Sequence, residues 1–116
     1  MDIATFRKKN YIESKMNTDG MCSDTELRDY AQKLKVCGHP VRLKLLCAIA
    51  REEDPCVSEL WVCLQQPQPV ISQHLAVLKD KGIVKSEVQG NRRIYSIVDP
   101  FVLDLVMTMV RTHAPV

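Results

Sequence analysis

The feature that most constrains the fold is a pair of short helical segments followed directly by a β-hairpin with a basic tip. Apolar residues at helical spacing predict one helix near residues 57–66 and a second that begins at Pro69 and ends at Gly82. Proline disfavours helix in the residue before it, so Gln65-Gln66-Pro67-Gln68 separates the two helices. Two alternating strands and the tight turn between them follow, at residues 83–88, 93–98 and 89–92.

Three further helices are predicted around this unit. Ser23 and Glu26 have the form of a capping box, which begins a helix. Gly38-His39-Pro40 interrupts that helix and starts the next, with His39 helping to begin it, and Asp99-Pro100 begins the last. The predicted helices cover residues 24–37, 40–51 and 100–113.

The fold class expected from this order is mainly α with a β-hairpin wing, α-α-α-α-β-β-α, which is the order of a winged helix-turn-helix. Residues 23–116 form the predicted folded domain, and residues 1–22 a polar arm that is flexible or a short helix. The last helix carries more apolar positions than one small domain can hide, so we expect a partner helix to cover it.

Polar side chains on the helix that begins near Pro69 suit the reading of double-stranded DNA. Its early residues are donors or acceptors, while its opposite face is apolar; the polar ones are Gln68, Ser72, Gln73 and His74. Arg92 and Arg93 at the hairpin tip suit phosphates or a narrow minor groove. Residues 68–93 hold five Lys and Arg against two Asp and Glu, an excess of three that the net charge of +2 conceals.

Composition narrows the class of protein. With 46% apolar and 26% charged residues the chain has a globular balance. We see neither a secretory signal nor an apolar run that could span a membrane, so we expect a cytoplasmic protein whose five cysteines are thiols. Cys-x-x-Cys, a glycine-rich phosphate loop and a readable nucleophile–base set are missing from the sequence, which argues against an enzyme.

Three stretches resemble the ArsR/SmtB family of bacterial winged-helix repressors: Leu34 to Leu46, Val70 to Val84 and Gly90 to Tyr95. The resemblance implies a homodimer, paired through its first and last helices, that binds an inverted repeat in operator DNA until an inducer arrives. It also implies that the DNA contacts are the residues named above on the second helix and the wing.

The inducer is expected to act through thiols, because thiolates bind soft ions and react with oxidants. Cys56 lies where many members of the family begin a Cys-x-Cys metal motif, but Ser58 replaces the second cysteine here. A trigonal site for As(III) or another thiophilic metal(loid) therefore needs two more sulfurs, for which Cys22 and Cys37 are the candidates.

Cys47 supports an alternative, a repressor that responds to oxidants or persulfides. It resembles the second-helix cysteine of the family's sulfide- and redox-responsive branch, yet residues 100–116 lack the partner cysteine, so another thiol has to serve. We expect Cys63 to be a core residue. Asp104 and His113 are too far apart to suggest a zinc-type site in the last helix. A winged helix that binds proteins instead of DNA is a more remote alternative.

Overall fold

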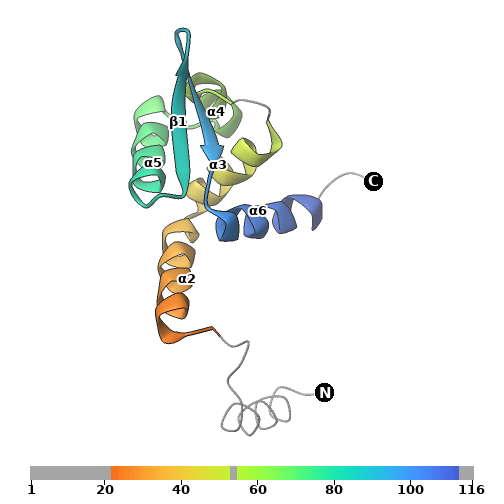
Figure 1. Cartoon of the computed structure of the whole chain (residues 1–116). Coiled ribbons are helices and arrows are strands. Elements are labelled where there is room, and N and C mark those ends of the chain that lie inside the picture. The colour runs from red at the N-terminus through yellow and green to blue at the C-terminus, as the bar shows by residue number, and fades with distance from the viewer. Residues whose placement is uncertain (1–21, 53–54, 113–116) are drawn as a thin grey trace, which may run out of the picture.

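The computed structural model describes residues 22–52 and 55–112, and within them it has five helices and a two-stranded hairpin in the predicted order (Figure 1). The elements are α2 (Asp24–Cys37), α3 (Pro40–Arg51), α4 (Val57–Leu64), α5 (Gln68–Asp80), β1 (Val84–Gln89), β2 (Arg92–Ile97) and α6 (Pro100–Thr112). The predicted arm lies outside the described residues apart from Cys22. In the two described ranges, every helix is too short or too polar to cross a bilayer.

The first two helices begin as the sequence predicts. The backbone N–H of Glu26 donates to Ser23 Oγ (3.1 Å), and that of Ser23 donates to Glu26 Oε1 (3.3 Å), which completes the capping box. At the start of α3, His39 Nδ1 accepts from the N–H of Val41 (3.1 Å), so this imidazole satisfies a backbone donor of the first turn.

The turn between α4 and α5 differs in length from the prediction. Helix α4 ends at Leu64, two residues earlier than expected, because Gln65 adopts a left-handed conformation with φ of 56°. Helix α5 starts at Gln68 and is followed by Gly82, whose φ of 73° is a conformation that glycine adopts without the strain of a Cβ. If α4 were longer, α5 would lie in a different position from the one that the short turn between them imposes.

The wing is an antiparallel hairpin whose strands are each one residue displaced from the predicted ranges. Gln89 pairs with Arg92, so Gly90 and Asn91 form the two-residue turn, with φ of 67° at Gly90. The segment before α4 pairs with the outer side of β2, since Cys56 bridges Ile94 and the N–H of Tyr95 donates to the carbonyl of Pro55 (3.0 Å). The wing is thereby connected to the start of α4 through backbone contacts.

The core lies where α3, α4, α5 and α6 meet the base of the hairpin. Its fully buried side chains come from all of these elements and include Leu45, Leu46, Leu60, Ile71, Leu75, Leu78, Ile83, Val102 and Val106. Helix α2 extends away from this body (Figure 1). It buries only Val36 and Cys37, at its C-terminal end.

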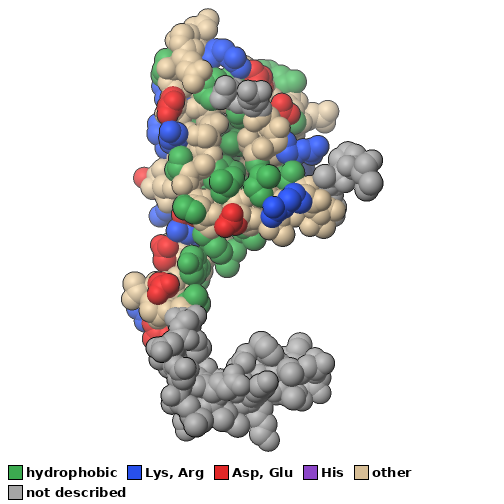
Figure 2. Space-filling model, turned by 45° about the vertical axis from the view of Figure 1, so that its right-hand side comes forward, with side chains coloured by type: hydrophobic (Ala, Val, Ile, Leu, Met, Phe, Trp, Pro, Cys, Tyr) green, Lys and Arg blue, Asp and Glu red, His purple; other side chains and the backbone are tan. Residues whose placement is uncertain are grey.

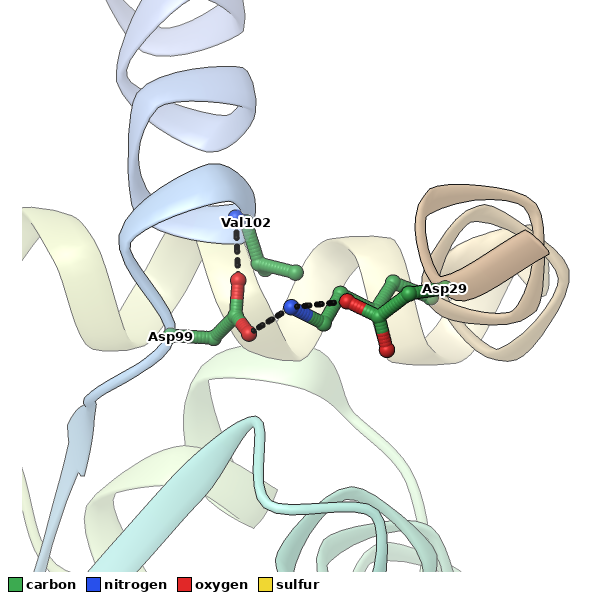
Figure 3. Close-up of polar contacts among 4 residues, drawn as sticks. Asp29, Asp99 and Val102 are labelled. Carbon is green, nitrogen blue, oxygen red and sulfur yellow. Dashed lines mark hydrogen bonds and ion pairs between the residues drawn. The ribbon is translucent and has the colours of Figure 1, made fainter. Parts of the chain in front are cut away.

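Helices α2 and α6 are connected by an ion-pair cluster of Asp29, Lys33 and Asp99 (Figure 3). Lys33 Nζ lies 2.6 Å from Asp99 Oδ2 and 3.0 Å from Asp29 Oδ2. Asp99 also caps α6, since its Oδ1 accepts from the N–H of Val102 (2.9 Å). Burial opposes the charged form of Asp99, but Lys33 and the backbone amides outweigh it and lower its pKa. Its stabilising contribution is therefore present above about pH 3.8 and is lost as pH falls through the lowered value.

Replacing Asp99 with alanine is expected to lower the free energy of unfolding by about 1–3 kcal/mol, because a helix cap and a charge-assisted hydrogen bond disappear together. Urea unfolding at one protein concentration, followed by circular dichroism, measures the difference. Asp29→Ala is the matched control, since this carboxylate is 62% exposed and should change stability much less. Equal losses in the two variants would contradict the role given to Asp99.

Large apolar side chains of α2 and α6 remain on the surface. Leu27 and Leu34 of α2 are 52% and 47% exposed, and Leu103 of α6 is 38% exposed. Tyr30 packs against Phe101 with ring centroids 4.6 Å apart, which joins the two helices into one surface. Figure 2 shows hydrophobic side chains along α2 and over the lower part of the body. This apolar α2–α6 surface fits the expectation of a partner helix.

Candidate nucleic-acid interface and thiol sites

Helix α5 presents a polar face to solvent. Gln68, Ser72 and Gln73 are all exposed, as the sequence predicts. The helix cannot rotate without exposing its opposite face, which is fully buried and consists of Ile71, Leu75 and Leu78. The polar residues lie in the first half of the helix, which is the part that reaches base edges when such a helix enters the major groove. Their amide and hydroxyl groups can donate and accept hydrogen bonds there.

His74 is held more tightly than the other three. It is half-buried, and its Nδ1 accepts from Arg42 Nε (3.2 Å), while its ring lies 4.5 Å from that of His39. Arg42 is fixed in turn by donating from Nη1 to the carbonyl of Val36 (3.1 Å). Burial, together with the charges of His39 and Arg42, lowers the pKa of His74. This imidazole therefore positions α5 against α2 and α3 in its neutral form.

The lowered pKa of His74 predicts a dependence of stability on pH. The unfolded chain binds a proton near pH 6.5 that the folded chain takes up only at lower pH. The free energy of unfolding should therefore rise with pH between these two values. We expect His74→Gln to reduce the slope of unfolding free energy against pH, measured from urea unfolding curves between about pH 5 and pH 8. This range extends about one and a half units to either side of the ordinary histidine pKa. An unchanged slope in the variant would show that other groups cause it.

The two wing arginines have different surroundings. Arg92 forms an ion pair and hydrogen bond with Glu59 of α4. Arg93 Nη1 donates to Ser86 Oγ (3.2 Å) on the neighbouring strand. Lys79 of α5 donates to the same hydroxyl (3.0 Å). Ser86 Oγ therefore accepts hydrogen bonds from two cationic side chains at the contact between α5 and the wing. Neither Glu59 nor Ser86 stands out in the sequence, because each acts through a residue distant along the chain.

Cys56 is the thiol with the most activated surroundings. It is the N-cap residue of α4 and is 6% exposed, and its Sγ lies 3.2 Å from Ser58 Oγ. The Ser58 hydroxyl, the backbone N–H of Glu59 and the Arg92 guanidinium together lower the pKa of Cys56 below its ordinary value. A helix N-terminus and a nearby cation both favour a thiolate. The reactive form of this thiol is thus stabilised beside the wing.

The other four cysteines differ among themselves. Burial raises the pKa of Cys37, which lies in the core, and that of half-buried Cys47. Cys22 and Cys63 are exposed, so the prediction that Cys63 belongs to the core is wrong. Within residues 22–52 and 55–112, no three His, Cys, Asp or Glu side chains gather as metal ligands would. One protomer thus supplies a single activated thiolate at Cys56 but not a complete trigonal site in its described part.

The last helix carries little metal chemistry in its described part. Asp104 is exposed, and its carbonyl accepts from the hydroxyl of Thr108 (2.8 Å). His113, the other residue considered there, lies outside the described residues.

A polar-faced second helix set beside a hairpin with basic residues defines a winged-helix transcriptional regulator that binds DNA. The model of the family described as "Bacterial regulatory protein, arsR family" matches residues 39–86. The chain belongs to this ArsR/SmtB family, and it is a transcriptional repressor. The relatives that it resembles are transcriptional regulators and not enzymes.

Three relatives illustrate the extent of the similarity. The uncharacterized HTH-type transcriptional regulator MJ1325 of Methanocaldococcus jannaschii is 40% identical over 76 residues, which cover 66% of this chain and 85% of that protein. The crystal structure of the transcriptional repressor PagR of Bacillus anthracis superposes with a TM-score of 0.68 at 31% identity, covering 75% of this chain and 99% of that one. The AntR antimony-specific transcriptional repressor gives a TM-score of 0.71 at 28% identity, covering 84% and 88%.

Proposed function

We propose that the protein is a homodimeric repressor that binds an inverted repeat in operator DNA and is released by a thiophilic metal(loid), As(III) above all, at a site that includes Cys56. Gln68, Ser72 and Gln73 read bases in the major groove, while Arg92 and Arg93 contact the phosphate backbone. His74 joins them through Nε2, its Nδ1 being engaged with Arg42. Such a repressor works where the chromosome is, in the cytoplasm. The observation that carries the proposal is the exposed polar face of α5 above a fully buried apolar face.

The apolar α2–α6 surface supports the homodimer. It combines three exposed leucines with the contact between Tyr30 and Phe101 on two helices that the ion-pair cluster connects. A second copy would cover this surface and bring a second α5 into a two-fold arrangement, which an inverted repeat matches. One of the structures similar to this chain is itself described as a homodimeric winged helix-turn-helix domain.

The surroundings of Cys56 support it as the sensing thiol. Its thiolate is stabilised in part by Arg92, which also forms the ion pair between the wing and Glu59 of α4. A ligand bound to the Cys56 sulfur would therefore disturb the contact between Arg92 and Glu59. As(III) prefers thiolate ligands, and the similarity to an antimony-specific repressor fits the same chemistry. Cys56 fits one ligand position only. For a second ligand position, exposed Cys22 is a better candidate than Cys37, which is only 2% exposed. In a dimer, this second ligand could be Cys22 of the partner subunit.

The central test is binding to the DNA upstream of the protein's own gene, compared with random DNA of the same length by fluorescence anisotropy. We expect a clear preference for the former and a steep loss of affinity with salt, because Lys and Arg contacts to phosphates release counterions. Equal affinity for both DNAs at moderate salt would overturn the proposal. The Arg92→Ala/Arg93→Ala variant separates DNA binding from a protein-interaction role, since unchanged regulation by this variant would favour the latter.

A further inference from the structure

Two cationic side chains donate to one hydroxyl group where α5 meets the wing. Lys79 Nζ, from the last turn of α5, lies 3.0 Å from Ser86 Oγ, and Arg93 Nη1 of β2 lies 3.2 Å from the same oxygen. The two nitrogen atoms therefore cannot be further apart than twice the longer of these distances. Like charges at this separation repel each other, so the arrangement favours an anion that contacts both.

The positive charge of this pair is not balanced by a carboxylate in the described part of the chain. Neither Lys79 nor Arg93 forms an ion pair there. The hairpin has one carboxylate, Glu87, which is paired with a neighbouring lysine. Because Glu87 follows Ser86 in β1, it points to the opposite face of the hairpin. Asp80, which follows Lys79 in α5, also lacks an ion pair among the described residues.

The Ser86 hydroxyl has one hydrogen left for a ligand. A hydroxyl group has two acceptor lone pairs and one hydrogen to donate. Lys79 and Arg93 occupy the two lone pairs, and an acceptor for the hydrogen is missing from the described residues. An ammonium, a guanidinium and a hydroxyl donor thus meet at one point. A phosphate group, which is negatively charged and has several acceptor oxygens, fits this set of donors.

The three side chains lie beside the polar face of α5. Lys79 follows Ser72 by seven residues, which is about two helical turns, so both exposed side chains lie on the same side of the helix. Ser86 is paired with Tyr95, and Arg93 is two residues from Tyr95 along β2, so Ser86 and Arg93 share one face of the hairpin. Helix α5 packs beside β1 (Figure 1), and a phosphate held here would lie between that helix and the wing.

We propose that Lys79, Ser86 and Arg93 form a binding site for a phosphate group, and that in the complex with the operator this group belongs to the DNA backbone between α5 and the wing. Ser86 is a positioning residue, because it holds the two cations at one point while it donates its own hydrogen to the phosphate. The choice of DNA as the source of the phosphate rests on the proposed function, whereas the phosphate site itself does not. Lys79 and Ser86 are absent from the DNA contacts that the sequence predicts.

Lys79→Ala is expected to weaken binding to operator and random DNA by the same factor, because a phosphate contact carries no information about the bases. The slope of log affinity against log salt concentration should lose about two units, since each of two protomers gives up one phosphate contact worth about 0.9. Fluorescence anisotropy at several salt concentrations measures both effects. Lys81→Ala is the matched control, because it removes an exposed cation from the opposite side of the end of α5, and its slope should stay nearly unchanged.

Ser86→Ala tests the positioning of the two cations. We expect affinity for both DNAs to fall about fivefold or more, since each protomer loses a hydrogen bond to a charged group, and Ser86→Thr to keep the wild-type affinity. In the Lys79→Ala/Arg93→Ala background, Ser86→Ala should have little further effect, whereas a general loss of folding would persist there. Ser96→Ala, on the other face of the same hairpin, is the control. An undiminished effect of Ser86→Ala in that background would contradict the positioning role.

An experiment without DNA separates the phosphate site from the proposed function. Inorganic phosphate, added to the isotope-labelled whole protein at constant ionic strength, should shift the amide resonances of Ser86 and Arg93 in a saturable way. Lys79→Ala/Arg93→Ala should abolish the shift at Ser86. If the wild type shows these shifts but does not prefer operator DNA, the proposed function fails and the phosphate site stands. The phosphate site is overturned if Lys79→Ala keeps the wild-type salt slope in a protein that prefers its operator, or if phosphate shifts neither resonance.

Discussion

Gln73→Ala is expected to weaken binding of the dimer to its operator by about 30-fold or more, while affinity for random DNA stays nearly the same. A good bidentate contact between an amide side chain and a base is worth about 1–3 kcal/mol, and a two-fold dimer loses it in both half-sites. Gln73 is exposed on the polar face of α5, next to Ser72 in the sequence and five residues after Gln68. Fluorescence anisotropy with operator and random DNA at one salt concentration measures both affinities.

The comparison needs a variant that makes the same chemical change elsewhere. Gln32→Ala is suitable, because Gln32 is exposed on the side of α2 away from Leu27 and Leu34. We expect it to bind the operator as the wild type does. If Gln73→Ala weakens random DNA and operator equally, Gln73 contacts the backbone rather than a base, and the direct reading of bases by this side chain is wrong.

The second large effect is expected at Cys56. In Cys56→Ser, arsenite should no longer release the protein from operator DNA at concentrations that release the wild type. Serine keeps the size of the side chain but offers a hydroxyl that stays protonated, whereas the Cys56 pKa is lowered by Ser58, the Glu59 N–H and Arg92. Titration of the preformed DNA complex with arsenite measures the release.

Cys47→Ser is the control for this experiment, since its thiol lies in a groove between α3 and α4 and its pKa is raised by burial. We expect this variant to be released as the wild type is, and Cys22→Ser to require more arsenite if that thiol supplies a further ligand. Release of Cys56→Ser at the wild-type concentration would remove Cys56 from the sensing site. Operator affinity without arsenite shows whether each variant is folded and active.

Local features of the fold were predictable because they depend on residues close together in the chain. The capping box at Ser23, the proline start of α3 and the cap at Asp99 all act within three or four residues, and each is as predicted. The polar face of α5 followed from helical periodicity in the same way. The end of α4 differed from the prediction by two residues, because Gln65 takes up a left-handed conformation that glycine or asparagine would have signalled. Each strand of the hairpin differed by one residue.

The interactions that complete the site were not predictable, because they join distant positions. Arg42 meets His74 across 32 residues and Arg92 meets Glu59 across 33. The wrong prediction that Cys63 is a core residue has a simpler cause. The inward stripe of α4 is Val57, Leu60, Trp61 and Leu64, which follow the i, i+3, i+4, i+7 pattern, and Cys63 falls outside it.

The ion-pair cluster of Asp29, Lys33 and Asp99 bears on how two protomers would meet in the proposed homodimer. Because Lys33 joins α2 to the first turn of α6 within one chain, both halves of the apolar surface have their relative orientation before a partner arrives. Association then costs less conformational entropy than it would if α2 had to find its place on docking. In the proposed homodimer, preorganisation of this kind would raise dimer affinity without adding a single contact between the subunits.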